Sequence, residues 1–254
     1  MLWFGLSSAR MRFFRSGSFE ALASVTIIAS QLAASYPVFA MDREAQARAL
    51  ALPQLQSRFR EAGLTYPART MFLRVYKFER VLELWARNND ESAFRLVHAY
   101  PVLAASGHAG PKLREGDEQV PEGVYRVVFF NPKSLYYLSL RLNYPNSSDL
   151  VRADRQHPGS DIYIHGNSVS IGCIAIGDEG ISEVYTAAHD ASDPITVFLF
   201  PAKFSTENVA RLTTEQPEFT KFWQQLQAID QFITTQQRLP AIRITAEGEY
   251  VLEQ

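Results

Sequence analysis

Short apolar runs, several of them alternating with polar residues, recur along most of the chain and predict strands. Residues 70–77 and 81–85 form a first pair, and the short charged segment between them predicts a hairpin. Further strands are expected over residues 93–103, 123–130, 135–140, 161–165, 173–176, 195–200, 241–245 and 250–252. Glycine, proline and asparagine residues separate these runs. The pattern predicts a mainly β fold, a β-sandwich or barrel-like domain with peripheral α-helices.

Apolar positions with a helical period occur in fewer segments. Residues 42–61 show this period first, and Pro53 is expected either to kink this helix or to start a new one. We expect this segment to be an adapter and not part of the core. Further helices are predicted over residues 179–188, 206–212 and 219–232. The run 195–200 is apolar and rich in β-branched residues, which is typical of a central strand.

The first forty residues have the pattern of a secretory signal peptide. Three arginines between residues 10 and 15 precede a mostly apolar run over 21–34, and segment 38–40 has small residues at its first and third positions. The run is shorter than the roughly 20 apolar residues that cross a membrane. We expect cleavage after Ala40, export to the periplasm and no stable membrane span afterwards. Glu20, unusual beside an apolar run, keeps a retained anchor as the alternative.

Composition excludes several functions. The 254 residues carry 25 basic and 27 acidic side chains, so the chain has no basic field for a phosphate backbone, and we expect no nucleic-acid partner. One cysteine, Cys173, cannot form an internal disulfide or supply paired thiolates to a metal. Metal-ligand spacing is also missing from His98, His108, His157 and His189. We therefore expect no metal and no cofactor.

The segment with candidate chemistry is 161–178. Alternation places His165 at the end of a strand, on the face opposite Ile164, and Cys173 opens the next strand after a loop rich in glycine and serine. A histidine can lower the pKa of a nearby thiol, and such a pair serves acyl transfer. The spacing alone leaves a small buried cysteine and a surface histidine as the alternative.

The small residues of this loop suggest further roles. Gly172 lets the backbone approach a substrate, so the amides of Gly172 and Cys173 are expected to form an oxyanion hole. The hydroxyl of Ser170 is expected either to donate to the substrate or to cap the turn, and we favour the turn.

These residues resemble the signature of the L,D-transpeptidase catalytic domain family, the YkuD type, which reads His-Gly, a variable loop, and Ser/Thr-His-Gly-Cys. His165-Gly166 matches the first part and segment 170–173 the second, except that Ile171 stands where most members have a second histidine. The short loop and this replacement are typical of the YafK-like branch. Other shared motifs follow in family order over residues 110–117, 120–123, 131–134 and 138–146.

The resemblance implies an enzyme that takes an acyl group from a peptidoglycan stem peptide. Carried over by position, Cys173 is the nucleophile, His165 is the base, and the carbonyl of Gly166 holds the imidazole tautomer. Residues of shared motifs that could line the substrate groove are Lys112, Arg114 and Tyr144. The missing second histidine puts in doubt whatever role that residue has in relatives, for example in shaping the oxyanion loop.

The resemblance leaves the acyl acceptor open: another stem amine, a lipoprotein lysine, or water. A hydrolytic variant that cleaves the stem peptide or releases a wall-attached lipoprotein is therefore an alternative, and so is a non-catalytic wall-binding module. A papain-like peptidase is disfavoured because the cysteine context does not match. The expected organisation is a signal peptide over 1–40, a helical segment over 41–69, the catalytic domain over 70–202, and a helical extension over 203–254 whose terminal strand packs on that domain.

Overall fold

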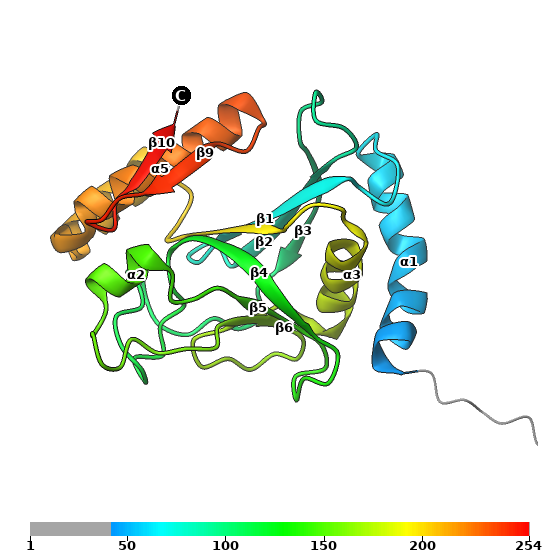
Figure 1. The fold of residues 1–254 in the computed structure, drawn as a ribbon, viewed down its shortest axis with the longest axis horizontal. Coiled ribbons are helices and arrows are strands. Elements are labelled where there is room, and N and C mark those ends of the chain that lie inside the picture. Colours follow the sequence, from blue (N-terminus) through cyan, green and yellow to red (C-terminus); the bar gives the residue numbers. More distant parts are fainter. Residues whose placement is uncertain (1–41, 254) are drawn as a thin grey trace, which may run out of the picture. The chain divides into compact units, whose positions relative to one another are not determined.

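The computed structural model describes residues 42–253 and has an eight-stranded sheet at its centre (Figure 1). The predicted signal peptide lies outside the described residues. In chain order the elements are α1 (Arg43–Glu61), β1 (Thr70–Tyr76), β2 (Val81–Arg87), β3 (Arg95–Pro101), β4 (Gly123–Asn131), β5 (Ser139–Leu142), α2 (Ser147–Arg152), β6 (Tyr163–His165), β7 (Ile174–Ala175), α3 (Gly177–Asp190), β8 (Thr196–Phe200), α4 (Thr206–Glu215), a short 3₁₀ turn η1 (Pro217–Phe219), α5 (Thr220–Gln236), β9 (Ala241–Ile244) and β10 (Tyr250–Glu253). The predicted fold class, a mainly β core with peripheral helices, is confirmed.

The sheet has the strand order β3-β2-β1-β8-β4-β5-β6-β7. The predicted hairpin is β1 with β2, and β8 lies between β1 and β4, so the apolar run 195–200 forms a central strand as expected. Strand β5 begins at Ser139 and not at residue 135, because the chain first turns through Tyr137, whose φ is 71°. The carbonyls of Ser134 and Tyr137 in this turn accept hydrogen bonds from Arg43 of α1.

Two apolar clusters cover the two faces of the inner strands. All seven residues of β1 are buried, and alternate side chains enter different clusters. Leu73 and Val75 belong to the cluster that contains α1 and α3, whereas Phe72 belongs to the cluster that contains α5. Figure 1 shows α5 on one side of β1 and the α1/α3 pair on the other. Burial on both faces explains why the central strands read as nearly continuous apolar runs.

Helix α1 corrects two expectations. It runs unbroken through Pro53, and its residues Ala47, Ala51, Leu55 and Phe59 are buried in the same core cluster as α3. The segment is therefore part of the core and not an adapter outside it. The helix continues because a buried stripe with a spacing of four residues extends on both sides of Pro53, which is itself exposed.

The C-terminal elements form a layer over the inner strands. Trp223, Leu226 and Ile229 of α5 pack in the second cluster. A buried ionic network joins this helix to the sheet: Arg74 of β1 pairs with Glu83 at 2.7 Å and with Asp230 of α5 at 3.1 Å. The last two strands, β9 and β10, pair with each other in a separate two-stranded sheet.

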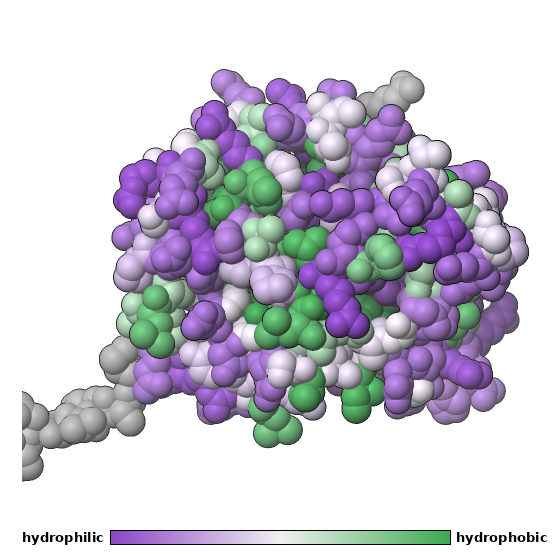
Figure 2. All heavy atoms as spheres, turned by 180° about the vertical axis from the view of Figure 1, so that it is seen from behind, coloured by the Kyte–Doolittle hydropathy of each residue, from purple (hydrophilic) through white to green (hydrophobic). Residues whose placement is uncertain are grey.

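The surface is mostly polar. Seen from behind, apolar side chains form scattered patches among polar ones (Figure 2). Among the exposed large apolar residues, Leu135 is 95% and Ile171 77% exposed. Within residues 42–253, no helix has an apolar stretch long enough to cross a membrane.

Candidate active site

Strands β6 and β7 place Cys173 and His165 on one face of the sheet. The strands are parallel, with Ile164 opposite Ile174 and His165 opposite Ala175. One residue earlier in this register, Tyr163 lies opposite Cys173. Side chains of paired residues share a face, and alternate residues return to it, so Cys173 and His165 are diagonal neighbours on the face opposite the buried isoleucines.

His165 is held in a defined orientation. The residue is only 2% exposed, and its Nδ1 lies 2.6 Å from the carbonyl oxygen of Gly166. A carbonyl can only accept, so Nδ1 carries the proton and Nε2 is the basic nitrogen. The ring of Tyr136 lies over the imidazole with its centroid 4.7 Å away. Burial lowers the pKa of His165, and the Gly166 carbonyl opposes this effect.

The thiol of Cys173 is partly exposed and contacts backbone groups. Its Sγ donates to the carbonyl of Asp161 at 3.9 Å, and the amide of Tyr163 donates to the sulfur. Burial raises the pKa of Cys173, and the Tyr163 amide and the charge of Lys112 partly offset this rise. Burial thus favours the neutral form of both residues, the imidazole and the thiol.

The two amides expected to form the oxyanion hole are both occupied by serine hydroxyls. The amide of Cys173 donates to Ser170 Oγ at 2.9 Å, and this hydroxyl donates back to the Cys173 carbonyl at 2.6 Å. The amide of Gly172 donates to Ser106 Oγ at 2.6 Å, and Ser106 in turn donates to the carbonyl of Glu118 at 2.7 Å. Ser170 therefore closes the turn, as the favoured interpretation expected, and an oxyanion hole requires both hydroxyls to move.

Gly172 is required at its position. Its φ is 88°, a conformation that side chains disfavour, and a Cβ would lie 3.3 Å from the carbonyl oxygen of Gln119. Ser106 and Gln119 thus bring a distant loop against the Cys173 turn. Sequence reasoning did not identify Ser106 because it lies 66 residues from Gly172, with no local pattern that links them.

The predicted groove residues differ in their positions. Lys112 is buried, and its ammonium pairs with Asp117 at 2.5 Å and donates to the carbonyl of Arg114 at 2.9 Å. The side chain of Arg114 is exposed. Tyr144 is 6% exposed and donates to the carbonyl of Pro158 at 2.8 Å, so it packs beneath the surface. Of the three, Lys112 is the one whose charge acts on Cys173.

Ile171 occupies the position of the second family histidine and is exposed beside Cys173. Its side chain is 77% exposed, so it offers the solvent an apolar surface in place of an imidazole. The backbone of this turn is held by Ser106 and Ser170, and the side chain of residue 171 takes no part in those contacts.

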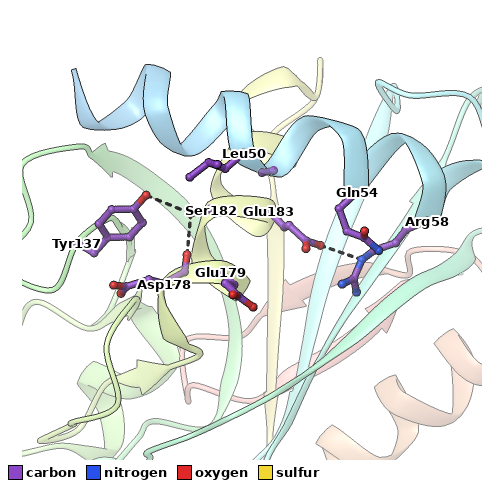
Figure 3. A pocket seen from close by; sticks show the side chains of 9 residues that line it. Leu50, Gln54, Arg58, Tyr137, Asp178, Glu179, Ser182 and Glu183 are labelled. Atoms are coloured by element: carbon purple, nitrogen blue, oxygen red, sulfur yellow. Dashed lines mark hydrogen bonds and ion pairs between the residues drawn. The ribbon is translucent and has the colours of Figure 1, made fainter. Parts of the chain in front are cut away.

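A cavity of about 540 Å³ lies between α1 and α3, and Cys173 does not line it (Figure 3). Arg58 and Glu183 form an ion pair in its wall at 3.1 Å. Asp178, also in the wall, accepts a hydrogen bond at 2.7 Å from the amide of Asn167, which belongs to the loop between His165 and Cys173. Asp178 thus links the wall of this cavity to that loop. Within residues 42–253, no three His, Cys, Asp or Glu side chains are grouped as metal ligands.

Comparison with known proteins identifies the domain. The L,D-transpeptidase catalytic domain family YkuD matches residues 72–197. YafK of Escherichia coli, whose name assigns it provisionally to the L,D-transpeptidases, is 30% identical over 188 residues, which cover 72% of this chain and 73% of that protein.

Solved structures with similarity include the helical cell shape determining protein Pgp2 of Campylobacter jejuni, at 16% identity and a TM-score of 0.44 over 76% of this chain and 81% of that chain. Bd1075 of Bdellovibrio bacteriovorus is 21% identical, with a TM-score of 0.39 over 67% of this chain and 63% of that chain. By its sequence matches, the chain belongs to the YkuD family of L,D-transpeptidase catalytic domains.

Proposed function

We propose that the protein is an exported cysteine acyltransferase that acts on peptidoglycan stem peptides, with Cys173 as the nucleophile and His165 as the acid and base. The observation that carries the proposal is the position of these side chains on one face of two adjacent strands, with the imidazole held through Nδ1 by Gly166. Membership of the family supports the substrate class.

In the first half-reaction, Nε2 of His165 accepts the thiol proton while the sulfur of Cys173 attacks the carbonyl carbon of the stem peptide. A carbon–sulfur bond forms and the amide carbon–nitrogen bond breaks. The imidazolium then gives its proton to the departing amine. Because burial favours the neutral form of both groups, proton transfer in this mechanism accompanies the attack.

In the second half-reaction, His165 removes a proton from the acceptor as it attacks the thioester carbonyl. The carbon–sulfur bond breaks, and the proton returns to the sulfur of Cys173. An amine acceptor gives a new amide and therefore a crosslink or an attachment, whereas water gives hydrolysis. The same two residues serve both outcomes, so only the identity of the products distinguishes transfer from hydrolysis.

The amides of Gly172 and Cys173 stabilise the oxyanion in this proposal once Ser106 and Ser170 release them. The exchange keeps the number of hydrogen bonds to each amide constant, because the substrate oxygen replaces a serine oxygen as the acceptor. A charged acceptor gains more from these dipoles than a neutral hydroxyl does, so the exchange favours the transition state.

Export to the periplasm is part of the proposal, because the wall substrate lies outside the cytoplasm. Its support is the composition of residues 1–40, with basic, apolar and small-residue segments in the order of a signal peptide. Mass measurement of the protein recovered from cells tests this point, and a chain that begins at Met41 is the expected result.

The activity is tested by incubating the purified protein with disaccharide tetrapeptides, with and without an amine acceptor, and measuring product masses. Cys173→Ala is expected to lower turnover by at least about 10⁴-fold, since the covalent step is lost. Ser168→Ala is the matched control, because this exposed serine lies in the same loop. We expect both variants to keep the unfolding temperature of the wild type.

A second measurement identifies the reacting atom. Incubation with a carbapenem is expected to add the mass of the compound to Cys173, and digestion locates the adduct. Unchanged turnover in Cys173→Ala would contradict the proposal. Stem-peptide binding without product or adduct would instead assign the chain to the wall-binding modules.

A further inference from the structure

A continuous row of side chains crosses the open face of the sheet and ends at Cys173. In the strand register, Phe129 of β4 lies opposite Arg141 of β5, and Arg141 lies opposite Tyr163 of β6. Tyr163 in turn lies beside Cys173, since its amide donates to the sulfur. Paired residues share a face, so the four side chains project from the same surface as the candidate nucleophile.

Exposure agrees with this register. In β5, Leu140 and Leu142 are buried in the core cluster, whereas the Arg141 side chain between them is 44% exposed. Phe129 is 48% exposed, and Tyr163 and Cys173 are half-buried. The row therefore forms a surface that a bound substrate can reach, with an aromatic ring, a cation, a second aromatic ring and the thiol in sequence.

The guanidinium of Arg141 is weakly engaged in the described structure. Its one ion pair is with Asp161, at 3.5 Å, and the carboxylate partner is itself 61% exposed. The guanidinium also lies 5.9 Å from the centre of the Phe129 ring. An exposed pair of this kind contributes little to stability, so a better-placed anion can displace Asp161 at little cost.

We propose that Arg141 binds a carboxylate of the stem peptide and is a specificity-determining residue for the reaction at Cys173. This inference rests on the proposed function. The planar guanidinium matches a carboxylate with two parallel hydrogen bonds. Phe129 and Tyr163 lie at the neighbouring positions of the row on either side of it. Arg141 and Cys173 are two strands apart, which separates their backbones by about 9–10 Å. The bound carboxylate is therefore one or two residues from the scissile carbonyl.

A purely structural role of Arg141 makes a different prediction. If the arginine only braces Asp161, whose carbonyl accepts the thiol proton, then Asp161→Asn and Arg141→Gln remove the same ion pair and have the same effect. If Arg141 binds substrate, Asp161→Asn removes a competitor for the guanidinium. The two variants then change the KM in opposite directions.

The experiment compares a disaccharide tetrapeptide with the same compound after amidation of its carboxyl groups, one position at a time. The purified wild type is expected to lose affinity when one particular carboxyl is amidated. Arg141→Gln is expected to raise the KM for the acid form roughly tenfold to a hundredfold, with kcat little changed and with no effect on the corresponding amide. Arg141→Lys restores part of the affinity, and Asp161→Asn lowers the KM.

Arg243→Gln is the matched control, because Arg243 is also an exposed strand arginine paired with a carboxylate, Glu253, at 3.2 Å. Calorimetric titration of both peptides into Cys173→Ala, with and without Arg141→Gln, measures binding apart from chemistry. The inference would be overturned if Arg141→Gln lowered the affinity for the acid and amide peptides equally, or if it changed kcat alone. Changes of the KM in the same direction in Arg141→Gln and Asp161→Asn would also overturn it. A wild type that binds the acid form selectively but gives no product would overturn the proposed function and leave the Arg141 assignment standing.

Discussion

The two halves of the eight-stranded sheet differ in what covers them. Strands β1, β2 and β8 are covered by α1 and α3 on one face and by α5 on the other, and β1 is buried along its whole length. Strands β5 and β6 pack against α3 on one face, and on the other face Arg141 and Tyr163 are only partly buried. The proposed chemistry lies on this open face, where Cys173 and Arg141 can reach a substrate.

The two halves also differ in how their polar groups are paired, which affects folding in one half and the proposed reaction in the other. In the covered half, polar groups are buried and paired with one another, as Arg74 is with Glu83 and Asp230. In the open half, Cys173 and Arg141 are partly exposed and have weak partners: the thiol donates to the carbonyl of Asp161 at 3.9 Å, and the guanidinium pairs with the Asp161 carboxylate at 3.5 Å. Substitutions in the covered half should therefore affect folding, and substitutions on the open face should affect the reaction.

The largest effect on stability is expected from Arg74→Ala. The change leaves Glu83 and Asp230 buried without their partner, which should cost about 3–5 kcal/mol in the free energy of unfolding. Urea denaturation measures the loss. Arg69→Ala is the control: its pair with Asp90 at 3.1 Å has both side chains 54% exposed, so it should cost at most about 1 kcal/mol. Equal losses for the two variants would contradict the distinction between buried and exposed charges.

The pH dependence tests the open half. Burial lowers the pKa of His165 in the folded chain. As the pH falls below about 6.5, the unfolded chain therefore binds a proton at this residue before the folded chain does, and the free energy of unfolding decreases. For the same reason, the acid limb of kcat/KM should have its midpoint below about 6.5.

Burial raises the pKa of Cys173, so alkylation by iodoacetamide should increase with pH up to values above the usual thiol pKa of about 8.5.

Turnover and alkylation measured between pH 5 and 10 check both limbs. Cys173→Ala should show no alkylation at any pH, which would assign the rise of alkylation at alkaline pH to Cys173. A thiol that reacts fully at pH 6 would show that the resting pair is an imidazolium and a thiolate, contrary to the neutral pair that burial favours. An acid limb above pH 7 would contradict the lowered pKa of His165.

A smaller effect is expected from Ser106→Ala. Removal of the hydroxyl frees the amide of Gly172, which then donates to the substrate without first losing a partner. One hydrogen bond contributes about 0.5–1.5 kcal/mol, so acylation of Cys173 should accelerate by roughly twofold to tenfold. Stopped-flow acylation by a carbapenem measures this, with Ser168→Ala as the control. A slower reaction would show instead that Ser106 is needed to hold the turn.

Sequence reasoning succeeded where the signal is local. Period-two and period-3.6 patterns identified the hairpin β1/β2, the central strand β8 and the C-terminal helices, because burial on a strand or helix face follows directly from spacing. The motifs that contain His165 and Cys173 could also be recognised in the sequence. The expectation that a new helix could start at Pro53 was wrong, because the packing of the Ala47 to Phe59 stripe against α3 outweighs a helix-breaking preference.

The sequence by itself determined the family, the fold class and the two residues proposed to react, because each depends on residue types at short spacings. The tertiary structure decided the rest. Ser106 meets Gly172 across 66 residues, and Arg141 reaches the row that ends at Cys173 through the register of β5, β6 and β7. Such contacts depend on which strands pair and in which register, and pairing is set by the burial of whole faces, which no local pattern specifies.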